Sequence, residues 1–258
     1  MITKLAKATG KKLIVVRATH GAYGADSLIN PPENKKLDYV AWSSTLSRVN
    51  NSFAVGQNAS LAAIAKRQFA GVANDWDYII LQNNTTVANT ASSDINMYNY
   101  LVNNGVKFKK FMLNATHYST GLGSDRKQEH LKAANTLNNK LKKAGKTQIV
   151  TVIKSGNIIG KYGSNWANEL TFDDSAHHMG GKAAYLYALT TYAKIYGVSE
   201  FAKSTKDSNY IKLYSNGTTK DFAPDKYNTS KCNKKISRCK VTQETAKKLQ
   251  SIVRNYYE

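Results

Sequence analysis

Two histidines and a nearby aspartate are the side chains in this sequence whose spacing is best suited to chemistry. Asp174 lies three residues before His177 and four before His178, in a polar loop ahead of an apolar stretch at 183–196. This spacing lets one loop hold a carboxylate against an imidazole, fixing its tautomer and stabilising the imidazolium that forms when histidine acts as a general base. The pattern predicts the acid–base part of a nucleophilic triad. A surface loop with two incidental histidines is the alternative.

The hydrophobic pattern predicts the elements that would position these side chains. Short apolar or β-branched runs indicate strands at 12–18, 78–81, 108–113 and 148–153. Helical spacing indicates helices at 2–9, 61–69, 94–103, 125–144, 183–196 and 243–256, the last capped by Thr242. Because strands alternate with helices, we expect a parallel sheet covered on both faces, with the active site beyond the carboxyl ends of the strands.

Further candidate site residues follow the predicted strands. They are Gln82 and Asn84 after 78–81, His117 after 108–113, and Gly21 and Gly24 after 12–18. For His117, lining a substrate pocket and a purely structural role are both open, and His20 shares that ambiguity. His130 lies on the lysine-rich predicted helix, so we expect it to be solvated.

Several segments, taken in order, resemble the conserved blocks of the SGNH (GDSL-like) ester hydrolases. Asp174-Ser175-Ala176-His177 is similar to the family's last block, Asp-x-x-His. Segment 76–85, WDYIILQNNT, resembles the third-strand block, which reads Gly-x-Asn-Asp in the family and Leu-Gln-Glu-Gln-Ser in one largely uncharacterised bacterial branch. Segments 19–23, THGAY, and 241–250, VTQETAKKLQ, are similar to that branch's Thr-x-Gly-Gly-Tyr and closing helix. The resemblance covers nearly the whole chain, and its specificity comes from order and spacing.

The resemblance implies a three-layer α/β/α, flavodoxin-like sandwich that hydrolyses esters through a serine, with no metal and no cofactor. It makes Asp174 the residue that orients the general base. The block spacing favours His177 as that base, whereas counting back from Tyr185 without a gap favours His178. The implied oxyanion donors are the backbone N–H of Gly21 or Gly24 and the side-chain amide of Asn84, with Gln82 beside them.

The chain departs from the family pattern at the nucleophile. No Gly-Asn-Ser or Gly-Asp-Ser follows a first strand, and segment 2–9 resembles the helix that comes after that block. We therefore expect the first strand to be missing, leaving 13–16 and 79–81 with unpaired edges. Such a fragment should be poorly stable, dimerised through the gap, or completed by a separate segment. Ser27, in Gly24-Ala25-Asp26-Ser27-Leu28, is the alternative nucleophile, and an ordinary turn-capping serine is its other interpretation.

The composition is that of a basic globular chain. Its 258 residues include 37 Lys and Arg against 17 Asp and Glu, a net charge of +20. We predict a single domain with a core at 1–200 and a basic extension at 201–258. This charge favours acidic partners such as cell-wall polymers. No compact Lys/Arg block marks a nucleic-acid groove, and no apolar run approaches the ~18–20 residues that span a bilayer.

Two functions of different classes stay open. One is hydrolysis of a small ester or acetylated carbohydrate, such as an O-acetyl group of a cell-wall polymer. The other is a non-catalytic SGNH scaffold that binds acidic polymers. We expect an extracellular or cell-wall-associated bacterial protein if an upstream signal peptide has been lost, and a cytoplasmic one otherwise. Cys232 and Cys239 would close a small disulfide loop in an exported protein, and free thiols are the alternative.

Overall fold

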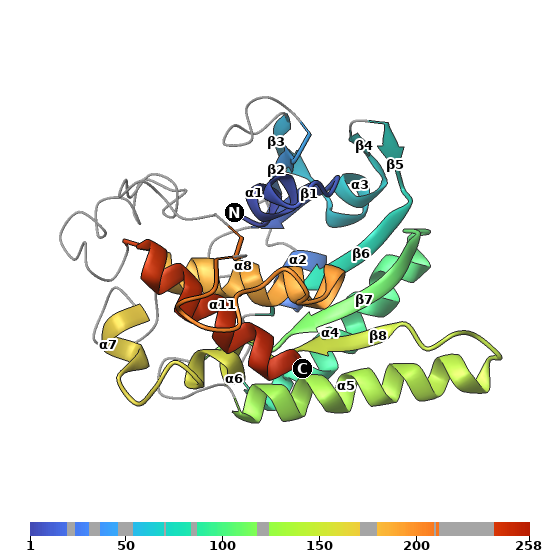
Figure 1. Cartoon of the computed structure of the whole chain (residues 1–258). Helices are drawn as coiled ribbons and strands as arrows, with labels where there is room; N and C mark the ends of the chain where they lie inside the picture. The colour runs from blue at the N-terminus through green and yellow to red at the C-terminus, as the bar shows by residue number, and fades with distance from the viewer. Residues whose placement is uncertain are drawn as a thin grey trace.

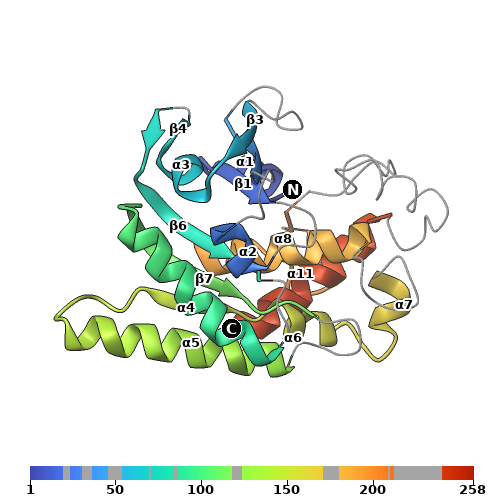
Figure 2. The same cartoon turned by 180° about the vertical axis from the view of Figure 1, so that it is seen from behind.

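The protein combines a parallel and an antiparallel sheet with helices around them, as Figures 1 and 2 show from opposite sides. The computed structural model describes residues 1–19, 24–30, 37–45, 54–69, 71–83, 87–117, 124–170, 180–208, 210–211 and 240–258. Within these ranges, no helix is long and apolar enough to cross a membrane.

The parallel sheet has the strand order β6-β7-β8, formed by Trp76–Leu81, Phe108–Asn114 and Val150–Ile153. All three were predicted as strands, and their parallel pairing confirms the α/β class. Helices α4 (Val87–Asn103) and α5 (Ser124–Lys143) cover one face, where they share a buried core with alternate residues of the strands. This alternation follows from the pleat, which sends successive side chains to opposite faces.

Helices α8 (Gly181–Tyr196) and α11 (Gln243–Tyr257) lie on the opposite side of the sheet, in front of it in Figure 1. They pack with α1 (Ile2–Ala8), α6 (Ser155–Gly160) and α7 (Trp166–Leu170) around a second buried core. The predicted cap of α11 is confirmed, because the Thr242 hydroxyl accepts a hydrogen bond from the Thr245 N–H at 3.1 Å. The parallel sheet is thus flanked by helices on both faces.

The antiparallel sheet corrects the prediction for segment 12–18. Strand β1 (Ile14–Thr19) pairs antiparallel with β2 (Leu37–Ser43), which pairs antiparallel with β3 (Ala54–Ala59). We expected β1 in the parallel sheet. Its partner is instead β2, and neither β2 nor β3 was predicted from the sequence. Along β2, Leu37, Tyr39 and Ala41 are buried and alternate with less buried residues, the period of a strand with one covered face.

Three short elements connect the two sheets. They are α3 (Leu61–Lys66) and the hairpin of β4 (Gln68–Phe69) and β5 (Val72–Ala73). Phe69 and Ile64 pack with β2 in a third buried cluster, which Trp76 at the start of β6 also contacts. The region predicted as one helix over 61–69 is therefore a short helix followed by a strand.

Among the described residues, strand β6 lies at the edge of its sheet, which agrees with the unpaired edge expected at 79–81. In the described part of the chain it pairs with β7 alone. Its Ile80 side chain is 39% exposed. The apolar run Tyr78-Ile79-Ile80-Leu81 therefore has one covered face, through Ile79 and Leu81, and one partly open face.

Candidate active site

A row of hydrogen-bonded polar side chains joins the carboxyl ends of the three parallel strands. Asn114, the last residue of β7, donates from Nδ2 to Gln82 Oε1 at 3.3 Å, directly after β6. Ser155, the first residue of α6, donates from Oγ to Asn114 Oδ1 at 2.7 Å. Asn114 and Ser155 are buried, whereas Gln82 is exposed. The predicted site residue Gln82 is therefore an exposed residue at the edge where α/β sheets bind ligands.

Helix α2 (Ala25–Ile29) is attached to the same edge. The Ala25 N–H donates to Asn83 Oδ1 at 3.0 Å, and Asn83 is buried directly beyond Gln82. On α4, the Ser93 hydroxyl and the Asn96 amide both donate to the Asp26 carboxylate. These contacts hold the short helix, which begins after Gly24 and contains Ser27, near the end of β6.

A buried polar chain extends from this edge into the α4–α5 interface. Asn83 Nδ2 donates to Asp94 Oδ1 at 3.2 Å, and Asp94 Oδ2 lies 2.5 Å from His130 Nδ1. Asp94 and His130 are both 0% exposed. The prediction that His130 is solvated is therefore wrong. Its spacing to Ala134, Leu137 and Leu141 on α5 puts it on the apolar face of the helix, which is the signal the sequence offered.

His117 lies just beyond β7, against α7 and α8. Its backbone N–H donates to the Tyr187 hydroxyl at 3.1 Å, and its Nδ1 is 2.8 Å from the same oxygen. Its ring also meets the Trp166 ring edge to face, with centroids 5.7 Å apart. His117 is half-buried, so one side of the imidazole is held while the residue keeps access to solvent. Tyr187 was not singled out from the sequence.

Glu169, on the same helix α7 as Trp166, interacts with polar and charged side chains of neighbouring elements. The Tyr162 hydroxyl donates to Glu169 Oε2 at 2.5 Å, and Lys248 Nζ lies 4.0 Å from the centroid of the Tyr162 ring. The hydrogen bond from Tyr162 lowers the pKa of Glu169, against the opposing effect of burial. Burial lowers the pKa of Lys182, whereas the Glu169 carboxylate raises it. These groups fasten α7 to α8 and α11.

Four of the predicted site residues are described: Gln82 follows β6, His117 lies just beyond β7, and Gly24 and Ser27 lie at α2, which is bonded to the end of β6. The others, Gly21, Asn84, Asp174, His177 and His178, lie outside the described residues, as do Cys232 and Cys239. Within the described ranges, no three His, Cys, Asp or Glu side chains cluster as metal ligands.

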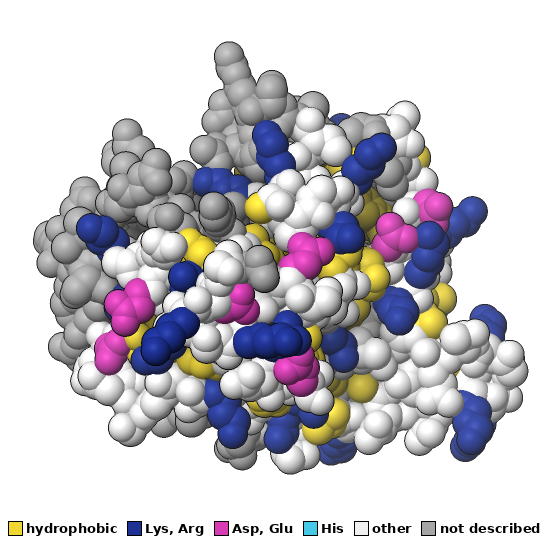
Figure 3. All heavy atoms as spheres, viewed as in Figure 1, with side chains coloured by type: hydrophobic (Ala, Val, Ile, Leu, Met, Phe, Trp, Pro, Cys, Tyr) yellow, Lys and Arg dark blue, Asp and Glu magenta, His cyan; other side chains and the backbone are white. Residues whose placement is uncertain are grey.

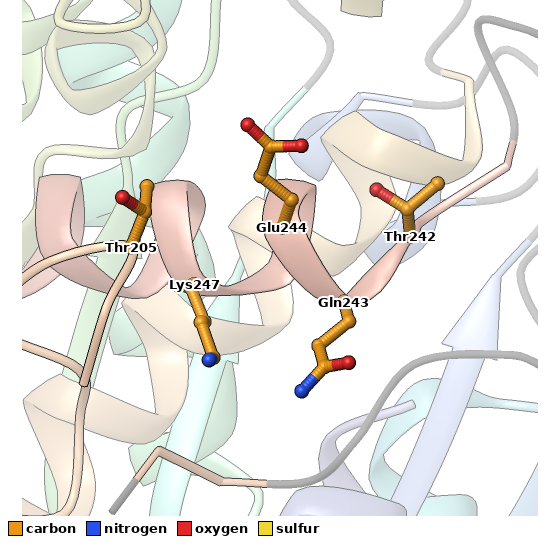
Figure 4. Close-up of a pocket in the computed structure, with 5 residues that line it drawn as sticks. All are labelled: Thr205, Thr242, Gln243, Glu244 and Lys247. Atoms are coloured by element: carbon orange, nitrogen blue, oxygen red, sulfur yellow. The ribbon is translucent and has the colours of Figure 1, made fainter. Parts of the chain in front are cut away.

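A surface hollow of about 410 Å³ lies elsewhere, at the start of α11. Thr205, Thr242, Gln243, Glu244 and Lys247 line it, as Figure 4 shows. None of the candidate residues at the strand ends is among them. The presence of Thr242 and Glu244 here is accounted for by helix stability, because a capping hydroxyl and an acidic side chain are both favourable at the first turn of a helix.

Comparisons with known proteins extend the description of the fold. No family model matches the chain, and no curated protein matches it. The structure is similar to the crystal structure of a DUF4886 family protein from Bacteroides uniformis, with a TM-score of 0.56 and 13% sequence identity. The likeness covers 99% of this chain and 87% of the other. This likeness shows that the two proteins share a fold.

Proposed function

We propose that this protein is an SGNH-type serine ester hydrolase domain, acting on a small ester such as an O-acetyl group of a carbohydrate or cell-wall polymer. One observation carries the proposal: the helix that holds Ser27 is hydrogen-bonded to the end of β6, through Ala25 and Asn83, beside the Gln82–Asn114–Ser155 row. Together with the resemblance of its motifs to the SGNH blocks, this supports an active site at that edge.

The proposed reaction is acyl transfer through a serine ester. A hydroxyl attacks the ester carbonyl, a histidine of the 177–178 pair takes its proton, and Asp174 orients that imidazole. The alcohol leaves with a proton from the imidazolium, and water then cleaves the acyl-enzyme. The nucleophile that we propose is Ser27 of α2. Backbone and amide N–H groups near Gly24 and Gln82 would meet the developing oxyanion.

Covalent labelling tests this proposal. A fluorophosphonate probe phosphonylates activated serines, and peptide mass mapping identifies the residue. We expect the label on Ser27, and no label on denatured protein. Ser208→Ala, which removes an exposed hydroxyl far along the chain, is the matched control and should label like the wild type. A label on a different serine would contradict the assignment of Ser27.

A second candidate, a non-catalytic module that binds acidic polymers, is favoured by a cluster of lysines. Burial lowers the pKa of Lys194, and the nearby charges of Lys154 and Lys110 lower it further. Like charges held together in this way favour an anionic partner. Figure 3 shows Lys and Arg side chains scattered over the face in view, with fewer acidic ones among them.

Retention on an immobilised polyanion tests the second candidate. A chain with Lys110, Lys154 and Lys194 all changed to Gln should elute at lower salt than one with Lys140, Lys142 and Lys143 changed to Gln. Both triple variants lose the same charge, so equal elution would show that only net charge matters and that the cluster is no site.

A further inference from the structure

We infer that Asn83 is a positioning residue, held in one amide orientation by Asp94 and His130, that fixes the start of α2 at the end of β6. The inference deepens the proposed function and rests on it for its catalytic consequence, because α2 carries Ser27 and begins after Gly24. The structural part of the inference concerns three side chains from three different parts of the chain and can be tested without any hydrolysis.

The hydrogen bonds lead from Ala25 through Asn83 to Asp94, whose other carboxylate oxygen contacts His130. The Ala25 N–H donates to Asn83 Oδ1 at 3.0 Å, and Asn83 Nδ2 donates to Asp94 Oδ1 at 3.2 Å. The second carboxylate oxygen, Asp94 Oδ2, is 2.5 Å from His130 Nδ1. The Asn83 side chain belongs to a residue only 1% exposed, and Asp94 and His130 are 0% exposed, so water does not compete for these bonds.

The chemistry of the groups allows only one orientation of the Asn83 amide. Asp94 Oδ1 accepts from the Asn83 NH₂, and Asp94 Oδ2 is engaged by His130 Nδ1, so the oxygen that faces Asn83 offers only an acceptor. The Asn83 NH₂ must therefore face Asp94, which leaves Oδ1 facing the Ala25 N–H. A flipped amide would set its oxygen against the carboxylate and its NH₂ against another N–H donor, and both hydrogen bonds would be lost.

Packing alone does not explain His130. Its Nε2 is buried and has no hydrogen-bond partner among the described residues. An apolar side chain in that place would carry no unpaired nitrogen of its own, and a buried polar atom without a partner is costly, so the histidine must make a favourable contact elsewhere. What the imidazole supplies is the Nδ1 contact to Asp94, which occupies the carboxylate oxygen that Asn83 does not use.

The consequence for the site is positional. The Ala25 N–H follows directly after Gly24, and Ser27 comes two residues later on the same short helix. Five residues make too short a helix to be stable by itself, so its place depends on such contacts. Holding Ala25 on Asn83 thus sets where the Gly24 backbone and the Ser27 hydroxyl lie relative to Gln82.

A polarity swap between residues 83 and 94 tests the inference. In Asn83→Asp, two carboxylates face each other and the bond between these positions is lost. In the double variant Asn83→Asp/Asp94→Asn, the side chain at position 83 still accepts from Ala25. It also accepts from the amide introduced at position 94, whose carbonyl can accept from His130. We expect hydrogen–deuterium exchange of the Ala25–Ile29 amides to rise at least about tenfold in the single variant. The double variant should return to within about threefold of the wild type.

Two outcomes would overturn the inference: unchanged exchange of α2 in Asn83→Asp, or a folded double variant no better protected than the single one. If Asn83→Asp does not fold, Asn83→Ala takes its place, because it removes the acceptor of Ala25 without adding a charge. Exchange requires no turnover, so a failure here leaves the hydrolase proposal standing. Normal exchange behaviour with no esterase activity would contradict the hydrolase proposal alone.

Discussion

At the residue scale, the buried polar side chains are the ones with defined tasks. Gln250 of α11 is 0% exposed and uses both ends of its amide. Its Oε1 accepts from the Ile211 N–H at 3.1 Å, and its Nε2 donates to the Ile211 carbonyl at 2.9 Å and to the Tyr185 hydroxyl at 2.7 Å. One glutamine thereby fastens α11 to α8 and to the backbone at Ile211.

Gln250→Glu should therefore be strongly destabilising, although it is nearly isosteric. The change removes the donor to the Ile211 carbonyl and buries a charge. We expect the free energy of unfolding to fall by about 2–5 kcal/mol in urea denaturation. Gln243→Glu, an exposed change in the first turn of the same helix, should stay within about 0.5 kcal/mol of the wild type. Equal effects of the two substitutions would contradict the role given to Gln250.

Glu169 should make stability depend on pH. The hydrogen bond from Tyr162 is the main cause that lowers the pKa of Glu169 in the folded protein. When folding lowers the pKa of a carboxyl group, the added stability is present above the pKa of the unfolded chain, about 4.3 for Glu. That stability is lost as the pH falls through the pKa of the folded protein. Wild type and Glu169→Gln should therefore differ most in free energy of unfolding above about pH 5 and converge in acid. Tyr162→Phe should flatten the same profile. A difference that stays constant from acid to neutral pH would contradict this account.

The candidate site could be predicted only in part at this scale. Gln82, Gly24 and His117 were singled out because they follow predicted strands, and Ser27 because its segment resembles the family's nucleophile block; both are local signals. Asn83, Asp94 and His130 were missed because each seemed an ordinary polar residue, and their contacts join the end of β6 to α4 and α5. Helical spacing did contain part of the answer, since Asp94 shares a face with Met97, Tyr98 and Leu101, all buried.

At the element scale, the helices with strong ends were predicted best. Helices α5 and α8 stop near Gly145 and Gly197, which have φ angles of 67° and 88°, as expected for left-handed glycine. Helix α4 begins at Val87, earlier than predicted. Its first turns are rich in Asn, Thr and Ser, whose weak helix propensity concealed them in the sequence. Strands β2 and β3 were missed, and with them the antiparallel pairing of β1, since pairing is set by contacts distant in sequence.

Removing the cap of α11 gives an element-scale prediction. The Thr242 hydroxyl accepts from the Thr245 N–H and so satisfies one free donor of the first turn. Thr242→Ala should lower the free energy of unfolding by about 1 kcal/mol, whereas Thr242→Ser, which keeps the hydroxyl, should lower it much less. Urea denaturation of both variants checks this. A serine variant as unstable as the alanine variant would show that the methyl group, not the hydroxyl, matters.

At the scale of the whole molecule, the parallel sheet and the three-stranded antiparallel sheet share no strand pairing among the described residues, and α3 with the β4–β5 hairpin connects them. Among the described residues, β1 pairs with β2 alone and β6 with β7 alone, and Ile80 of β6 is 39% exposed. Exposed strand edges favour association with another strand. The DUF4886 family protein shares this fold over nearly all of the present chain.

Ester turnover with and without Ser27 is the most direct test of the central claim, that this fold carries a serine hydrolase site at the end of β6. Hydrolysis of a short-chain nitrophenyl ester would be followed for wild type, Ser27→Ala and the control Ser208→Ala. We predict that any turnover above buffer depends wholly on Ser27, so that Ser27→Ala has none while Ser208→Ala matches the wild type. Robust turnover that Ser27→Ala leaves unchanged would contradict the account, because the nucleophile would then lie elsewhere.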